Sequence, residues 1–146
     1  MGKSSFVHVG LTVSDIDRSV AFYEKYFGFK VKRSGQFPDG FFDAKPTLYR
    51  LKQGAGSEIA IIVSPDGVEL ELFRFLDQTP FAEPAWDTPG YHHICLKVED
   101  VNDKYLEMKA DGVEFFFEPD FKGDPKNNEF WVFLRDPDGN YIELQS

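Results

Sequence analysis

The stretch HVGLTVSDID at residues 8–17 decides the fold, because a second version of it, HICLKVEDVN, occupies residues 93–102. Both copies alternate apolar and polar residues in the way typical of a β-strand, and both then reach an acidic residue that can cap a helix. The two halves also end alike, since PDGVELEL at 65–72 matches PDGNYIEL at 137–144. Such self-similarity indicates that one structural unit occurs twice in the chain.

Each copy predicts the element order β-α-β-β-β. In the first copy Ser14 or Asp15 can cap a helix that ends at Gly28, where a left-handed residue is favoured. Residues 47–52 are predicted as an additional strand. The expected strands of the first copy are 6–13, 29–36, 58–63 and 67–75. The second copy is expected to have strands at 92–98, 114–117, 130–135 and 140–145, and a helix at about 101–110.

The repeat predicts an α+β fold with two paired β-α-β-β-β modules in a single domain, residues 1–146. The modules span about 1–76 and 91–146. A linker at 77–90 joins them, and its prolines are typical of irregular structure. Units this short seldom bury enough apolar surface alone, so we expect them to pack together.

Composition and charge exclude several classes of protein. The formal net charge of −9 argues against a nucleic-acid partner and against an anionic membrane surface. The longest apolar run, at 59–63, is far too short to cross a bilayer. Cys95 is the single cysteine, so no disulfide can form within the chain. We therefore expect a cytoplasmic protein without nucleic-acid or membrane partners.

Histidine and glutamate recur on the polar faces of the repeated strands. Successive side chains of a strand point to opposite faces, so His8 and His93 lie opposite the apolar residues that should pack on the helices. Glu71 and Glu143 do the same in the strands that follow the two Pro-Asp-Gly turns. If a pseudo-twofold axis relates the modules, these four side chains can converge. Two imidazoles and two carboxylates suit one divalent metal ion, such as Zn²⁺, Ni²⁺, Co²⁺, Mn²⁺ or Fe²⁺.

Three neighbours of these residues receive a plainer interpretation. His92 competes with His93 for the role of metal ligand, but the repeat and the apolar alternation favour His93. Glu69 is interpreted as a solvated surface residue. Cys95 shares the face of His93 and is interpreted as a small buried side chain that fills space.

The repeated motifs resemble the vicinal oxygen chelate superfamily, the group of glyoxalases, bleomycin-resistance proteins and extradiol dioxygenases. The resemblance covers nearly the whole chain, from His8 to Glu143. It is carried by HVGL at 8–11, YEKYFGF at 23–29, HICL at 93–96 and DPDGNYIEL at 136–144. It implies the glyoxalase-like fold, a U-shaped mixed sheet around a metal-binding cleft, and a homodimer.

The ligand set indicates a branch of that superfamily. Glyoxalase I has glutamate at the position matching Glu71, whereas ring-cleaving dioxygenases use two histidines and one glutamate. The resemblance therefore implies a glyoxalase- or epimerase-like lyase or isomerase, in which the metal stabilises an enediolate while a carboxylate moves the neighbouring proton. By the same resemblance Glu143 is the base and Glu71 its counterpart. An Fe(II) ring-cleaving dioxygenase and a non-catalytic small-molecule binding or resistance protein stay open as alternatives.

The substrate is less well defined by the sequence. The resemblance implies a small molecule, and thiol conjugates of glutathione or CoA are anionic, so they would need local positive charge. The loop at 118–129 is a candidate lid. The basic residues available to bind such a substrate are Arg18, Arg33, Arg50, Arg74, Lys122 and Lys126.

Overall fold

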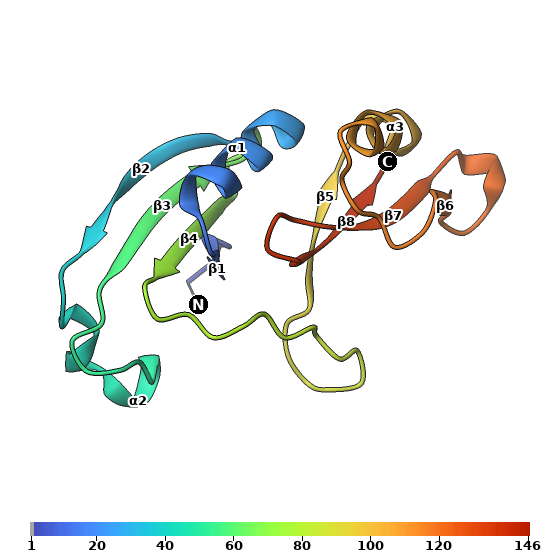
Figure 1. The fold of residues 1–146 in the computed structure, drawn as a ribbon. Coiled ribbons are helices and arrows are strands. Elements are labelled where there is room, and N and C mark those ends of the chain that lie inside the picture. Colours follow the sequence, from blue (N-terminus) through green and yellow to red (C-terminus); the bar gives the residue numbers. More distant parts are fainter. Residues whose placement is uncertain (1) are drawn as a thin grey trace. The chain divides into compact units, whose positions relative to one another are not determined.

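A computed structural model describes residues 2–146 of the chain. The chain forms two compact units that divide between Pro80 and Phe81, within the stretch predicted as a linker. Each unit has its own four-stranded mixed sheet with a helix packed against it (Figure 1). The predicted α+β class and the repeated β-α-β-β-β order are confirmed. Among residues 2–146, no helix combines the length and apolarity that crossing a membrane requires.

The first unit buries one face of its sheet beneath a helix. Its strands are arranged β1-β4-β3-β2, with β1 parallel to β4 and the other pairs antiparallel. The core beneath the helix includes Tyr23, Ile62 and Leu72, which are almost fully buried. The elements are β1 (His8–Thr12), α1 (Ile16–Phe27), β2 (Lys30–Phe37), β3 (Ser57–Val63) and β4 (Glu69–Phe75).

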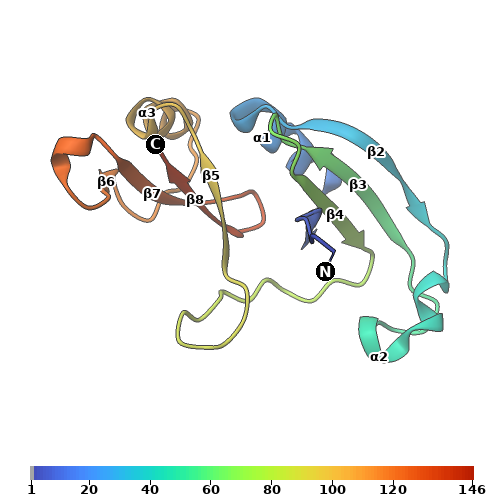
Figure 2. The same ribbon diagram turned by 180° about the vertical axis from the view of Figure 1, so that it is seen from behind.

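The second unit repeats this arrangement (Figure 2). Its strands are arranged β5-β8-β7-β6, again with the first and last strands parallel. Met108, Leu134 and Ile142 are fully buried between the helix and the sheet. The elements are β5 (His93–Lys97), α3 (Val101–Ala110), β6 (Asp120–Phe121), β7 (Phe130–Arg135) and β8 (Tyr141–Gln145).

The two main helices begin in the same way. Asp15 accepts a hydrogen bond from the Arg18 backbone N–H at 2.9 Å, and Asp100 accepts one from the Asp103 N–H at 3.0 Å. Each carboxylate thus accepts a hydrogen bond from a backbone N–H that has no partner within the first helical turn. Its negative charge also interacts favourably with the positive end of the helix dipole. Of the two predicted caps of the first helix, Asp15 is the one that caps it. Gly28 ends the helix with a left-handed φ of 70°.

The predicted strand at 47–52 is wrong. This region holds a 3₁₀ turn at Phe41–Ala44 and a short helix, α2, at Pro46–Tyr49. Pro46 is the first residue of this helix, where a backbone N–H would have no partner within the helix. The missing N–H of proline therefore costs nothing there, and proline favours the start of a helix. Phe42 is buried edge-on against Tyr49, so ring packing holds the segment in this form.

The predicted strand at 114–117 is also wrong. A single β-bridge joins Phe115 to Leu134, and the regular pairing with β7 occurs later, at Asp120–Phe121. Pro119, which has no N–H to donate to a ladder, lies between this bridge and β6. The predicted lid loop at 118–129 accordingly contains β6 and a 3₁₀ turn at Pro125–Asn127.

Candidate metal centre

The first unit brings one predicted histidine and one predicted glutamate together. His8 lies on the edge strand β1, and Glu71 lies on the neighbouring strand β4, where it is in register with Gly10. His8 Nε2 is 3.3 Å from Glu71 Oε2. The imidazole is 48% exposed and the carboxylate is 21% exposed, so the pair lies at the surface of its own unit.

The second unit builds the same pair from the same offset. Glu143 on β8 is in register with Cys95, two residues after His93 on β5. His93 Nε2 is also 3.3 Å from Glu143 Oε2. This pair is less exposed, at 23% for the imidazole and 14% for the carboxylate. The pairing of the four predicted residues is thus His8 with Glu71 and His93 with Glu143.

The donor atoms of each pair fit a divalent metal ion. Two atoms that each lie about 2.1 Å from one ion, at a tetrahedral or octahedral angle, are about 3.0–3.4 Å apart. The measured 3.3 Å in each unit falls in that range. No group of three or more His, Cys, Asp and Glu side chains is positioned for a metal within residues 2–146. Each pair is therefore at most half of a four-ligand centre.

Glu143 is held by further side chains. Gln145 donates a hydrogen bond from Nε2 to Glu143 Oε1 at 2.7 Å, so the two carboxylate oxygens have different partners. The Cys95 thiol also hydrogen-bonds to this carboxylate. Partial burial, followed by the charge and the hydrogen bond of Glu143, raises the pKa of the Cys95 thiol to about 11. The residue as a whole is exposed to solvent although its thiol is partly shielded, so its interpretation as a buried filler is wrong.

Glu71 lies among different neighbours. Its cross-strand neighbour is Gly10, which has no side chain, and the ring of Phe73 lies 4.0 Å from where a Cβ on Gly10 would be. Glu69 precedes it on the same face, is only 16% exposed, and forms an ion pair with Lys32. The interpretation of Glu69 as a solvated residue is therefore wrong, because the bulged strand β2 brings an ammonium group to it.

Aromatic rings surround His93. Phe133 on β7 meets the imidazole edge-on, with ring centroids 5.0 Å apart. Trp86 lies 5.4 Å from the imidazole and 5.6 Å from the ring of Phe133, measured between centroids, so the three rings contact one another. His92 Nδ1 is 2.7 Å from His93 Nδ1, so His92 contacts the predicted ligand rather than replacing it. The period of two residues in β8 could have placed Gln145 on the face of Glu143, but nothing in the sequence places Trp86 here.

The predicted substrate-binding residues have varied surroundings. Arg18 donates to Ser14 Oγ at 2.8 Å, and Arg74 forms an ion pair with Glu58 at 2.9 Å. These two side chains are engaged within the first unit. Lys122 lies close enough to Cys95 for its positive charge to lower the pKa of the thiol, against the larger effects that raise it. Lys122 is thus one of the predicted basic residues whose charge reaches the neighbourhood of His93 and Glu143, through its effect on Cys95.

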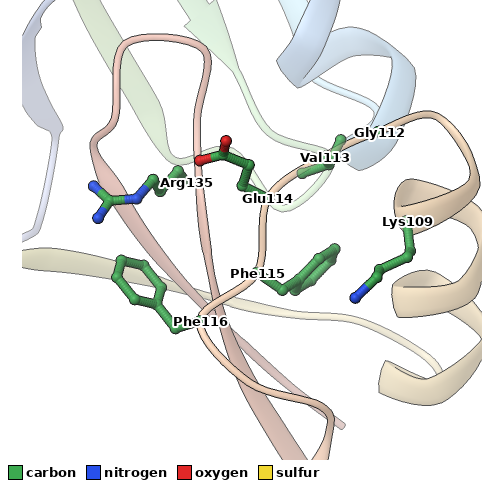
Figure 3. A pocket seen from close by; sticks show the side chains of 7 residues that line it. All are labelled: Lys109, Gly112, Val113, Glu114, Phe115, Phe116 and Arg135. Atoms are coloured by element: carbon green, nitrogen blue, oxygen red, sulfur yellow. The ribbon is translucent and has the colours of Figure 1, made fainter.

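A pocket of about 590 Å³ opens elsewhere in the second unit, beside the end of α3 (Figure 3). The side chain of Lys109 extends from α3 toward Phe115, and Phe116 lies beneath Arg135. Lys109 donates to the Tyr105 hydroxyl at 3.0 Å, and Arg135 forms an ion pair with Glu83. None of the residues that line this pocket belongs to the two His–Glu pairs.

Two paired modules, each with a histidine on its first strand and a glutamate on its last, define a class of proteins. The sequence profile of the Glyoxalase/Bleomycin resistance protein/Dioxygenase superfamily matches residues 5–144. The chain belongs to this superfamily, and the resemblance seen in the sequence is confirmed.

Similar proteins include several that are named lactoylglutathione lyase. The probable lactoylglutathione lyase of Synechocystis sp. is 30% identical over 139 residues, which cover 94% of this chain and 92% of that protein. The lactoylglutathione lyase of Pseudomonas aeruginosa is 27% identical over 155 residues, with 95% and 80% covered. The chain spans only 43% of glyoxalase I from Saccharomyces cerevisiae, to which it is 29% identical.

Solved structures agree with the fold. A glyoxalase family protein from Bacillus cereus has a TM-score of 0.77 at 22% identity, with 99% of this chain and 97% of that chain covered. Glyoxalase I of Leishmania major, which is described as trypanothione-dependent, has a TM-score of 0.64 at 26% identity, with 97% and 86% covered.

Proposed function

We propose that this protein is a metal-dependent, glyoxalase I-like lyase or isomerase that moves a proton next to a carbonyl group. The observation that carries the proposal is the His–Glu pair, which recurs in both units with the same 3.3 Å separation. We infer that His8, Glu71, His93 and Glu143 together bind one divalent ion. The relatives named lactoylglutathione lyase support this class of reaction.

The bound ion would stabilise negative charge as it develops on a substrate oxygen. We propose Glu143 as the residue that accepts the proton from the adjacent carbon, with Glu71 as its counterpart. Glu143 is suited to hold a proton at a defined position, because Gln145 and His93 contact different oxygens of its carboxylate. A base that is fixed within hydrogen-bonding reach of a proton can contribute roughly 10²–10⁴-fold to the rate.

We propose that the substrate is an anionic thiol conjugate. Lys122 lies near enough to Cys95 for its charge to act on the thiol, and its ammonium group could bind a carboxylate of such a conjugate. Phe133 and Trp86, which pack against each other beside His93, offer apolar surface to the part of the substrate near the carbonyl. We also propose that the protein acts as a homodimer. In a dimer the four metal ligands can come from one chain or from both chains.

The test is to measure bound metal and turnover in the same preparations. The chelator-treated protein is reloaded with Ni²⁺, Co²⁺, Zn²⁺ or Mn²⁺ and assayed with the hemithioacetals of glutathione and trypanothione and with acyl-CoA epimers. We expect one ion per four-ligand set and turnover of a hemithioacetal. Absence of turnover with every metal and substrate would overturn the proposed activity.

Two other results would redirect the assignment. Turnover that requires Fe²⁺ and molecular oxygen would indicate a ring-cleaving dioxygenase, in which Glu71 is not needed. Failure of the wild-type protein to bind any divalent metal would indicate a non-catalytic binding protein. Glu69→Gln is the matched control, because Glu69 lies on the same strand face as Glu71 but pairs with Lys32.

A further inference from the structure

We propose that His92 is a positioning residue that orients His93 as a metal ligand through a hydrogen bond between their Nδ1 atoms. This inference rests on the proposed metal centre. The two Nδ1 atoms are 2.7 Å apart, which requires a proton between them. His93 Nε2 points the other way, toward Glu143 Oε2. The two nitrogens of the His93 ring therefore have separate partners.

The shared proton determines which nitrogen of His93 can bind a metal. A neutral imidazole carries one proton, on either Nδ1 or Nε2. When Nε2 gives its lone pair to a metal, the proton must be on Nδ1. His93 Nδ1 then donates to His92 Nδ1, and His92 carries its own proton on Nε2. Such a partner orients the ring of a ligating histidine and makes it a better ligand.

The same contact also suits the metal-free protein. There His93 can donate from Nε2 to the Glu143 carboxylate and accept at Nδ1 from His92. Imidazole can be donor or acceptor at Nδ1, so the hydrogen bond persists when the metal binds and only the proton positions change. A backbone carbonyl in the place of His92 could only accept a hydrogen bond. It would therefore suit only the metal-bound form, in which His93 Nδ1 carries the proton.

Packing fixes His92 in place. Its ring is nearly parallel to that of His93, with centroids 4.8 Å apart and an angle of 21° between the planes. Trp86 covers it, with centroids 4.0 Å apart. Phe133 contacts His93 edge-on. These contacts restrict the rotation of both imidazoles. Forming the hydrogen bond between them therefore costs little further side-chain conformational entropy.

The first unit offers a natural control. Val7 precedes His8 as His92 precedes His93, and Val7 is an exposed residue that can neither donate nor accept a hydrogen bond from its side chain. The proposed role is therefore specific to the second unit. A change at Val7 should leave metal binding unaltered.

The first experiment measures the hydrogen bond in the wild-type protein by ¹⁵N NMR of the histidine rings, before and after addition of Zn²⁺. We expect coupling between the two Nδ1 nuclei in both states. On Zn²⁺ binding the His93 proton should be found on Nδ1. A His93 ring that remains protonated at Nε2 in the loaded protein, or absence of the coupling, would overturn the inference.

The second experiment measures the dissociation constant for Zn²⁺ by competition with a chelating dye. We expect His92→Leu to weaken binding by roughly 10–100-fold. His92→Asn should retain most of the affinity, because its amide can also donate or accept near the position of Nδ1. Val7→Leu should match the wild-type protein.

The outcomes separate the two proposals. If wild-type protein does not bind Zn²⁺ or the other divalent ions, the proposed metal centre fails and this inference fails with it. If wild-type protein binds Zn²⁺ and His92→Leu binds it equally well, only the role of His92 is overturned. Circular dichroism and thermal unfolding of each variant identify any loss of affinity that comes from misfolding.

Discussion

The surroundings of Glu71 and Glu143 differ although the two residues occupy corresponding positions. Both lie beside a histidine Nε2 at 3.3 Å. Glu143 also contacts Gln145 and Cys95, whereas the corresponding neighbours of Glu71 are Phe73 and Gly10. The duplication therefore keeps the two ligand types in both halves while their immediate environments have diverged. If the proposed function is correct, we expect the two glutamates to contribute similarly to metal binding and unequally to proton transfer.

Replacing each glutamate by glutamine should have the largest effect and tests this inequality directly. We expect Glu143→Gln to lower turnover by roughly 10²–10⁴-fold, because an amide cannot accept the substrate proton. The variant should retain metal with reduced affinity. Glu71→Gln should reduce metal affinity with a smaller loss of turnover at saturating metal. Steady-state kinetics and metal titration provide both measurements, with Glu69→Gln as the control.

Near wild-type turnover in Glu143→Gln would refute Glu143 as the base. A larger loss in Glu71→Gln than in Glu143→Gln, measured with metal bound, would reverse the assignment of the two carboxylates.

The alkylation rate of Cys95 should also report on the environment of Glu143, with a somewhat smaller change than the loss of turnover in Glu143→Gln. In chelator-treated protein the thiol should react with iodoacetamide about 100-fold more slowly at pH 8 than an ordinary thiol, since its pKa is about 11 rather than 9.0. The rate should rise about tenfold per pH unit from pH 7 to pH 10 without levelling, because the thiolate fraction follows the pH below the pKa. Mass spectrometry of the modified protein measures the rate.

Glu143→Gln should speed this alkylation, because the neighbouring negative charge contributes to the raised pKa of the thiol. Glu69→Gln lies in the other unit and should leave the rate unchanged. A pH–rate profile that levels near pH 9 would contradict the interaction between Cys95 and Glu143.

Gln145→Leu should have an intermediate effect, confined to the second half. Loss of the 2.7 Å hydrogen bond to Glu143 should weaken metal binding by about 10-fold, since groups that orient a ligand contribute on this scale. Phe73→Leu is the matched change beside Glu71 and should alter the affinity less. Titration with Zn²⁺ compares the two variants, and equal affinities would show that the different environments do not affect metal binding.

The helix caps should give the smallest effect and test a feature that the halves share. Asp15→Ala and Asp100→Ala each remove one hydrogen bond to a free N–H in the first helical turn. Each should lower the free energy of unfolding by about 1 kcal/mol. Chemical denaturation measures both, with Asp15→Asn and Asp100→Asn as variants that keep a capping side chain. A loss in one half alone would show that the two helices depend differently on their caps.

The features that repeat in the sequence could be predicted, because each copy supports the other. The alternation around His8 and His93 was sufficient to put each on the polar face of its strand, and the two Glu-Leu endings put Glu71 and Glu143 on the corresponding faces. The strands and their faces follow from a period of two residues. The pairing of His8 with Glu71 and of His93 with Glu143 was found from the register of the parallel strands in the structure.

Features present in only one half were predicted poorly, as was the repeated strand expected at 114–117, which pairs with β7 later in the chain. Helix α2 has no counterpart in the second unit, and the apolar residues Leu48, Tyr49 and Leu51 suit a strand as well as a helix at that length. The contact of Gln145 with Glu143 depends on which rotamers two flexible side chains adopt. Neither a period nor a repeat carries that information, so such contacts were found only from the structure.

The separate sheets have a consequence for how the chain can be rearranged. Every strand of each sheet pairs with strands of its own half, and each half starts and finishes on adjoining parallel strands. The chain could be cut between Phe75 and His93 and its original ends joined by a flexible linker. Neither change would remove a strand from its sheet or break a pair of hydrogen-bonded strands. The order of the halves along the gene is therefore not dictated by strand pairing, and circularly permuted forms should build the same two sheets.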